Sequence, residues 1–198
     1  MTEVIRRSKI LSRKVAISLM ERDSTKDIYD IINNLEEFIE SFGIKVFYSN
    51  MDGFEVPSLI SGYSIVNKNG YPEIVINANE SLARQRFTMA HEFGHIIMHW
   101  SWLDNQSQGL DKNKYEVLYR KSLYDNNYSD LKEIQANEFA SELLLPHKLL
   151  KNIIGDVEAL KKDPVALEEI KKRVASAFNV SLSFANVQLL KIIQGDFD

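Results

Sequence analysis

The chain has 198 residues, of which 44% are hydrophobic and 26% are charged, and its formal net charge at pH 7 is −4. This length suits one domain with a sizeable core and leaves little room for a second domain. The negative charge gives no overall attraction for a nucleic-acid backbone, and the absence of cysteine excludes disulfides, thiolate catalysis and cysteine-type zinc sites.

The N-terminal segment, residues 3–21, has a helical pattern with a basic local face. Its basic residues are Arg6, Arg7, Lys9, Arg13 and Lys14. Neighbouring acidic residues dilute this charge, so a solvated helix face is favoured over a nucleic-acid contact. Because the basic residues also interrupt the apolar stretches, no signal-peptide core or transmembrane segment is predicted. We therefore expect a soluble, cytoplasmic protein without a membrane partner, and direct nucleic-acid binding is disfavoured.

The next elements change from helix to sheet. A core-packing helix is predicted from Ser24 or Thr25 to residue 42, with Gly43 as its stop signal. Residues 44–49 then predict a short strand, and residues 62–78 predict a hairpin whose two strands are joined by the turn signal NKNG. The following helix can be capped by Asn79 or Ser81.

The second half of the chain begins with a polar stretch, residues 103–128, that is typical of a long functional or mobile loop. A helix is expected from Ser129 or Asp130 to Pro146, and helix-start signals recur near residues 163 and 181. These elements indicate an α+β fold in a single domain spanning residues 1–198. Its core covers about residues 25–150 and carries a small sheet that contains antiparallel strands, and a helical extension covers about residues 151–198.

The segment HEFGH places two histidines and a glutamate on the helix that follows the hairpin. His91 and His95 are four residues apart, so their imidazoles lie on one helix face and can bind the same ion. Catalytic zinc commonly has two histidine ligands, one carboxylate ligand and a water, whose proton the adjacent Glu92 could accept. A coincidental pair of helix histidines is the alternative, but the spacing and the helical context favour a zinc site.

The two remaining histidines are weaker ligand candidates. One further helical turn moves the Cα of His99 about 6 Å beyond that of His95, which is too far for the same ion on an unbroken helix. His99 is therefore predicted either to contact a ligand residue without binding the ion itself or to serve in packing. His147 follows Pro146 at a helix end, where a surface position is favoured over a ligand role.

A carboxylate should complete the site, and the segment EIQANEFASELLLP offers three glutamates. Helical phase places Glu133 at the edge of the predicted buried arc, whereas Glu138 and Glu142 point about 100° or more from its centre. Glu133 is favoured over the alternative of an exposed glutamate at a helix start. Asn137, one turn later, could accept a hydrogen bond from the outer nitrogen of a ligating histidine.

The two segments RQRFTMAHEFGHIIMH and EIQANEFASELLLP together resemble the ImmA/IrrE-type metallopeptidases, a small gluzincin-like group of bacteria, their phages and mobile elements. The resemblance covers about residues 25–150. It implies a zincin-like core with an active-site helix and a following glutamate-bearing helix. It also implies one zinc ion on His91, His95 and Glu133, with Glu92 as general base. The family's methionine before the proline is Leu145 here, a difference that concerns packing.

The resemblance further implies that the substrate is a helix-turn-helix repressor or a similar regulatory protein. We expect the peptide to lie antiparallel to an edge strand at Ile74, Val75, Ile76 and Asn77, using the backbone groups there. Residues 103–128 could gate entry. The donor that stabilises the oxyanion is left open between His99 and a tyrosine of that stretch: Tyr115, Tyr119, Tyr124 or Tyr128.

Two other classes of function are compatible with the sequence. The protein could be a non-catalytic zinc-containing module that sequesters a regulator, as an anti-repressor or antitoxin does, although a purely structural site would not need Glu92. It could also be a DNA-binding regulator that uses the basic N-terminal helix. The sequence favours the zinc-dependent endopeptidase.

Overall fold

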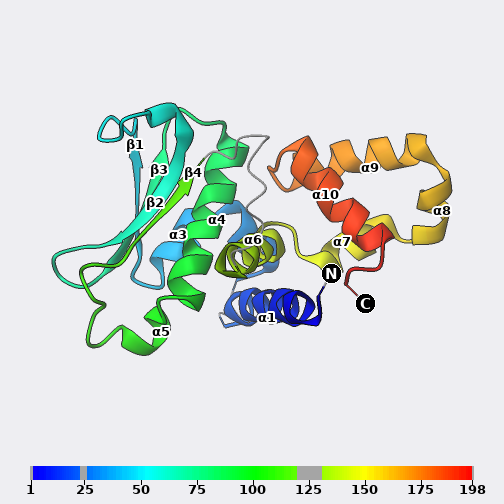
Figure 1. Ribbon diagram of the computed structural model, residues 1–198. Coiled ribbons are helices and arrows are strands. Elements are labelled where there is room, and N and C mark those ends of the chain that lie inside the picture. Colours follow the sequence, from blue (N-terminus) through cyan, green and yellow to red (C-terminus); the bar gives the residue numbers. More distant parts are fainter. Residues whose placement is uncertain (1, 23–25, 120–130, 198) are drawn as a thin grey trace.

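A four-stranded sheet lies at one end of the molecule and the C-terminal helices lie at the other (Figure 1). The computed structural model describes residues 2–22, 26–119 and 131–197. Between the two ends, helix α4 packs on the sheet, and α6 and α1 form the next layer (Figure 1). The predicted α+β class, with a small sheet and a C-terminal helical region, is confirmed.

The sheet has the strand order β1-β3-β2-β4. Its strands are β1 (Lys45–Ser49), β2 (Ile60–Val66), β3 (Pro72–Asn77) and β4 (Tyr115–Tyr119). β3 pairs in parallel with β1 and antiparallel with β2, so the predicted hairpin is confirmed. β4 pairs antiparallel with β2, which means that the expected loop at residues 103–128 in fact contributes an edge strand. A strand of only five residues that pairs with a distant segment, β2, has little local pattern by which to predict it.

The strand predicted to bind substrate is not an edge strand. Ile74 is paired with Val46 of β1 on one side and with Ser64 of β2 on the other. The backbone of residues 74–77 (Ile74, Val75, Ile76 and Asn77) is therefore used within the sheet, and the edge-strand prediction is wrong. Its physical cause is the crossover connection that places β1 beside β3, an arrangement that no local pattern encodes. β1 and β4 lie at the two edges instead.

Among the described residues, three helices precede the first strand, and α3 contacts both α4 and β1. α1 (Glu3–Met20) is capped by Thr2 and packs closely against α6. The single helix expected up to residue 42 is two short ones, α2 (Ile28–Asn33) and α3 (Leu35–Glu40). They divide at Asn34, whose φ of −112° and ψ of 48° are not helical. The predicted starts at residues 24 and 25 lie outside the described residues.

α4 (Leu82–Met98) carries the HEFGH segment and is capped by Ser81, one of the two predicted caps. The short α5 (Trp102–Asn105) follows. α6 (Leu131–Leu144) ends just before Pro146, and its predicted caps at residues 129 and 130 lie outside the described residues. α6 lies between α4 and α1, which explains why residues all around its C-terminal half are buried (Figure 1).

Four helices make up the C-terminal extension. They are α7 (His147–Ile154), α8 (Val157–Lys162), α9 (Pro164–Ala177) and α10 (Leu182–Ile193). Asp163 caps α9 and Ser181 caps α10, as predicted. One hydrophobic cluster joins the extension to the rest, because Phe139 of α6 and Leu189 of α10 both belong to it.

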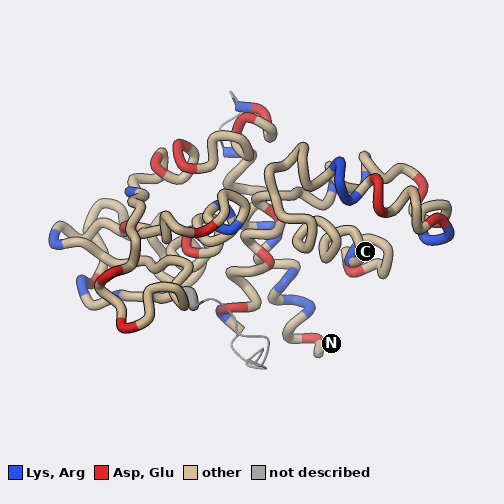
Figure 2. The backbone as a smooth tube through the Cα atoms, turned by 90° about the horizontal axis from the view of Figure 1, so that it is seen from above, with Lys and Arg blue, Asp and Glu red and all other residues tan. Residues whose placement is uncertain are grey.

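Basic and acidic positions are both spread over the chain and do not gather into one large region of a single sign (Figure 2). No helix in the described part of the chain is both long and apolar enough to cross a bilayer.

Candidate metal centre

Two imidazoles meet on one face of α4. Ser81 fixes the start of the helix by accepting a hydrogen bond from the backbone N–H of Arg84 at 3.4 Å. Ten residues later, His91 and His95 lie one turn apart, with ring centroids separated by 4.7 Å. Their Nε2 atoms are 3.0 Å apart and both side chains are buried, so the two nitrogens point to one common position.

Helix α6 brings a carboxylate to the same position. Glu133 places Oε1 3.0 Å from Nε2 of His95 and Oε2 3.4 Å from Nε2 of His91. A ligand atom from each of the three residues lies within 4.8 Å of the other two, the one such group of possible metal ligands in the described ranges. Because 34% of the Glu133 side chain is exposed while the imidazoles are buried, the group opens to solvent on the glutamate side. The structure thus brings together the three residues that the sequence singled out.

Gly94 sets the distance between the two helices that carry these ligands. A Cβ atom at this position would lie 3.0 Å from Cδ1 of Phe139 and 3.3 Å from the Cα of Ala136, both on α6. Such contacts are tighter than ordinary van der Waals packing. A side chain at residue 94 would therefore push α6 away, and Glu133 with it.

The outer nitrogens of both histidines are held by neighbours. Asn137 Oδ1 lies 3.1 Å from Nδ1 of His91, and Nδ1 of His99 lies 3.0 Å from Nδ1 of His95. Nε2 of His99 is in turn 3.1 Å from Oε1 of Gln135. If His91 donates to Asn137, His95 to His99 and His99 to Gln135, every contact of the outer nitrogens is satisfied and both Nε2 atoms carry lone pairs for a metal ion. Asn137 and His99 occupy the supporting positions predicted for them, whereas Gln135 was not anticipated.

The protonation states suit metal binding. Burial lowers the pKa of His91 and outweighs the opposing effect of Glu133, so this imidazole stays neutral at pH 7. Partial burial raises the pKa of Glu133, but its close contacts with His91 and His95 outweigh this effect and keep the pKa of the carboxyl well below its usual range. A neutral imidazole and an ionised carboxylate are the forms that bind a metal ion.

The donor chemistry fits a divalent metal ion. Two imidazole nitrogens and one carboxylate oxygen from two adjacent helices are a common set for catalytic zinc, which keeps a fourth position for water or substrate. Buried ligands with solvent on one side match such an open site.

Glu92 lies beside the ligands but turns toward the sheet. Its Oε2 accepts a hydrogen bond of 2.6 Å from Oγ of Ser64, a residue of β2, and both side chains are buried. The sequence did not single out Ser64. Its only signal was a serine in a mostly apolar strand that contains a second serine, Ser61, and such serines are common without functional meaning.

A family model described as the IrrE N-terminal-like domain matches residues 39–190, more than half of the chain. The chain belongs to this peptidase family. Metallopeptidase ImmA of Bacillus subtilis (strain 168) is 30% identical over 94 residues, which cover 48% of this chain and 47% of that protein. The chain thus matches about half the length of this curated relative. The range matched by the family model, residues 39–190, includes all three ligand candidates and Glu92. The resemblance that the sequence indicated is confirmed.

Of the four tyrosines considered as oxyanion donors, Tyr115 is the one whose side chain lies within the described residues. Tyr115 lies in β4 with half of its surface exposed. Tyr119 is the last residue of β4, and its side chain is outside the described part, as are Tyr124 and Tyr128. The choice between these residues and His99 stays a prediction.

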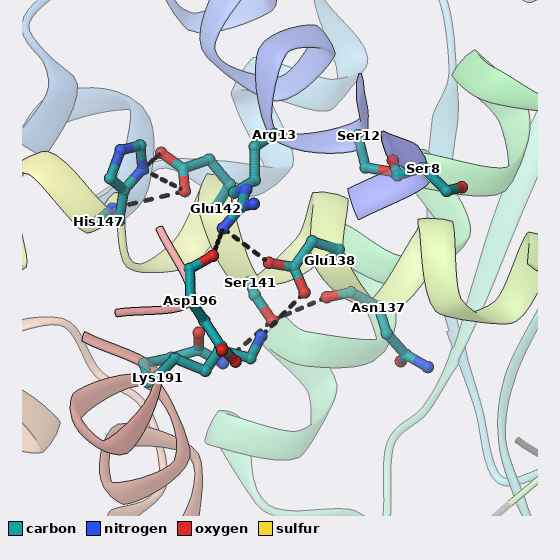
Figure 3. Close-up of polar contacts among 11 residues, drawn as sticks. Ser8, Ser12, Arg13, Asn137, Glu138, Ser141, Glu142, His147, Lys191 and Asp196 are labelled. Atoms are coloured by element: carbon teal, nitrogen blue, oxygen red, sulfur yellow. Dashed lines mark hydrogen bonds and ion pairs between the residues drawn. The ribbon is translucent and has the colours of Figure 1, made fainter. Parts of the chain in front are cut away.

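A second polar cluster surrounds Glu138 and Glu142 of α6 (Figure 3). Arg13 of α1 and Lys191 of α10 point at Glu138 from two directions, with nitrogen-to-oxygen distances of 3.5 Å and 2.9 Å (Figure 3). One turn later, Glu142 lies 2.8 Å from Nδ1 of His147. Glu138 and Glu142, which the sequence disfavoured as ligands, are buried side chains that face Arg13, Lys191 and His147 rather than outward-pointing residues.

The same cluster corrects two sequence predictions. Arg13 was expected on a solvated face, yet it is 8% exposed because α6 and the C-terminal residues cover it. His147 was expected at the surface, but only 18% of its side chain is exposed and its ring stacks on Phe197 with centroids 5.0 Å apart. Because Arg13 points inward, the basic face of α1 is smaller than the sequence suggested, which weakens the DNA-binding alternative.

Proposed function

We propose that this protein is a zinc-dependent endopeptidase that cleaves a regulatory protein. The observation that carries the proposal is the convergence of His91, His95 and Glu133 on one position, with Glu92 next to His91 on the same helix. Membership of the peptidase family and the similarity to Metallopeptidase ImmA of Bacillus subtilis support it.

In the proposed mechanism, one residue transfers a proton, and others orient that residue and the metal ligands. When bound, zinc would polarise the scissile carbonyl and make a water molecule more acidic. Glu92 accepts the proton of that water and passes it to the leaving amine, which is general acid–base catalysis. Ser64 holds one oxygen of the carboxylate, and Asn137 and His99 fix the two imidazole rings.

The outer edge of β4 is the proposed substrate strand, in place of residues 74–77. β4 pairs with β2, whose Ser64 contacts Glu92, and on its other side β4 has no strand partner within the described residues. The other edge strand, β1, is separated from Ser64 by β3. An extended peptide could add to β4 through main-chain hydrogen bonds and would then run past Glu92.

The proposed substrate is a helix-turn-helix repressor or a similar DNA-binding regulator. This part rests on the resemblance to the ImmA/IrrE-type metallopeptidases and on the two segments that carry it. Cleavage of such a regulator would take place in the cytoplasm, the location expected from the sequence.

Substitution of Glu92 by glutamine tests the proposal. The variant keeps the size of the side chain and leaves the zinc ligands unchanged, so it should bind zinc and partner but lose about 10² to 10⁴-fold in cleavage rate. The assay uses the helix-turn-helix regulator encoded beside this gene, with and without a chelator, and follows both fragment formation and derepression in cells. Cleavage by Glu92→Gln at the wild-type rate would contradict the proposal.

Sequestration of the regulator is the second candidate, and the burial of Glu92 favours it. The side chain is 1% exposed, which is low for a group that must reach substrate. A sequestering protein would relieve repression without producing fragments, and its Glu92→Gln variant would relieve repression as well as the wild type does. The same variant therefore separates the two candidates.

A further inference from the structure

A cavity of about 730 Å³ lies between the helices of the metal centre and the C-terminal extension. Its walls come from four helices: α1, the first half of α4, α6 and α10. A volume of this size is within the range of small-molecule and peptide sites and exceeds that of one amino-acid side chain.

The walls of the cavity are mainly apolar. Each of the four helices contributes at least one large hydrophobic residue to the lining: Ile5, Phe87, Ile134, Phe184 and Val187. The rings of Phe87 and Phe184 lie 5.7 Å apart and connect α4 to α10. Val187 is half-exposed, so apolar surface is open to solvent here and would be covered by an apolar ligand.

The charged groups of the lining all have the same sign. Lys9, Arg84 and Lys191 contribute to it, and no carboxylate does so among the described residues. The partners of Arg84 and Lys191, Glu80 and Glu138, are not part of the lining, and Lys9 has no ion-pair partner within the described ranges. A positive lining stands out in a chain whose net charge is −4.

The cavity adjoins the metal centre through two shared residues. Asn137 lines the cavity and its Oδ1 contacts His91. Phe87 also lines it, and its ring lies 6.1 Å from the ring of His91. A peptide that fills the cavity would therefore leave it within one or two residues of the ligands.

We propose that this cavity binds a segment of the protein substrate that combines large apolar residues with aspartate or glutamate and adjoins the bond to be cut. The apolar walls accept the hydrophobic side chains, and Lys9 at the rim attracts the acidic ones. The position beside His91 favours a substrate segment over an independent small molecule. The inference rests on the proposed function, since it names the substrate class of the same site.

Peptide binding to an inactive protein tests this inference separately from cleavage. A library of random dodecapeptides is passed over immobilised, zinc-loaded Glu92→Gln protein, and the retained peptides are sequenced. Peptides that carry both apolar and acidic residues should be enriched over the input. Lys9→Glu, introduced in addition, should reduce the retention of acidic peptides about fivefold, the effect of one exposed charge pair.

Matched controls distinguish the cavity from general surface effects. Lys14→Glu changes the same charge on the same helix but does not line the cavity, so acidic peptides should still be retained. Val187→Trp should narrow the cavity and shift retention toward smaller apolar residues, whereas Val165→Trp on the exposed face of α9 should not. If Lys9→Glu fails to fold, Lys9→Gln gives the same comparison with a smaller effect.

The outcomes separate the two proposals. Equal peptide profiles for the Lys9 and Lys14 variants would overturn the inference, even if wild-type protein cleaves the library. Selective retention of acidic, apolar peptides that wild-type protein never cleaves would support the inference and contradict the proposed endopeptidase.

Discussion

Oγ of Ser64 lies 2.6 Å from Oε2 of Glu92, and the two residues are 0% and 1% exposed. The contact joins a sheet strand to the helix of the metal centre at the residue proposed as general base. Hydrogen bonds to charged groups contribute about 1.5 to 3 kcal/mol, more than those between neutral groups. Ser64 therefore fixes the direction of the carboxylate rather than only filling space.

Ser64→Ala is expected to slow peptide cleavage about tenfold or more while leaving the zinc content at one ion per chain. The reason is that the carboxylate of Glu92 loses a donor worth about 1.4 kcal/mol or more to its orientation. The measurement is kcat and KM on a cleaved peptide together with metal analysis. The loss should appear in kcat, because Ser64 is not proposed to contact substrate.

Ser61→Ala is the matched control for that experiment. Ser61 lies on the same strand and is equally buried, but its hydroxyl contacts Glu80 and Arg84. Both variants lose a buried hydroxyl, so a general loss of stability would affect them equally. The same reduction of kcat in Ser61→Ala would show that Ser64 has no special role.

Metal binding should depend on the three converging residues. His91→Ala and His95→Ala are expected to abolish stoichiometric zinc binding, and Glu133→Ala should weaken it strongly. Equilibrium dialysis followed by metal analysis gives the result. Glu138→Gln is the control on the same helix, since Glu138 faces Arg13 and Lys191 instead of the histidines. Full zinc retention in both histidine variants would eliminate the site.

Gly94→Ala tests whether close helix packing places Glu133. Alanine favours a helix over glycine by about 1 kcal/mol, so α4 itself should form at least as well. The added Cβ would meet Phe139 and the backbone of α6, however, and should move Glu133 outward. We expect zinc affinity to fall on the order of tenfold, the size of effect seen when the support of a ligand is disturbed.

Competition with a chromophoric chelator measures that affinity, and Gly53→Ala provides the control. Nothing lies within 4 Å of a Cβ atom at residue 53, so this substitution should leave zinc affinity unchanged. Unchanged affinity in Gly94→Ala would mean that α6 can shift without moving its glutamate.

Local spacing explains why the ligands could be predicted. His91 and His95 share a helix face by the helical repeat alone, and Glu133 was chosen by its phase on α6. The phase argument was only partly right, because Glu138 and Glu142 are buried as well. What separates them from Glu133 is what they face, namely the basic residues of α1 and α10 and His147 instead of His91 and His95.

The predictions that failed depended on contacts between distant parts of the chain. The interior position of β3 follows from β1, which is joined to it by a crossover through β2, and the burial of Arg13 follows from α6 and the C-terminal residues. The contact of Ser64 with Glu92 spans 28 residues. A single sequence shows the periodicity of each element but not which element will pack beside it.

The buried ion pairs of Glu138 with Arg13 and Lys191 should stabilise the folded protein. Glu138→Ala leaves Arg13 and Lys191 without their carboxylate, and removal of one partner from a buried ion pair costs about 3 to 5 kcal/mol. Urea unfolding measures the change. Lys161→Ala, which removes one partner of an exposed pair with Glu158, should change stability by about 1 kcal/mol or less. Equal effects in the two variants would contradict a structural role for the cluster.

The metal-free protein should lose stability as the pH falls below about 6.5, the usual pKa of an unfolded histidine. Burial lowers the pKa of His91 in the folded protein, so between the folded and unfolded pKa values the unfolded chain binds the extra proton. The free energy of unfolding then decreases with falling pH by up to about 1.4 kcal/mol per unit for this one group. The lowered pKa of Glu133 adds an effect of the same sign below about pH 4.5.

Urea unfolding in the presence of a chelator, repeated between pH 7.5 and 5.5, should therefore give a positive slope of stability against pH. His91→Gln removes the titrating imidazole, so its slope should be smaller by the contribution of one proton, whatever its absolute stability. Comparing slopes rather than midpoints matters here, because glutamine also changes the packing against Asn137 and Phe87. An identical slope in wild type and variant would show that the buried imidazole of His91 is not the group that resists protonation.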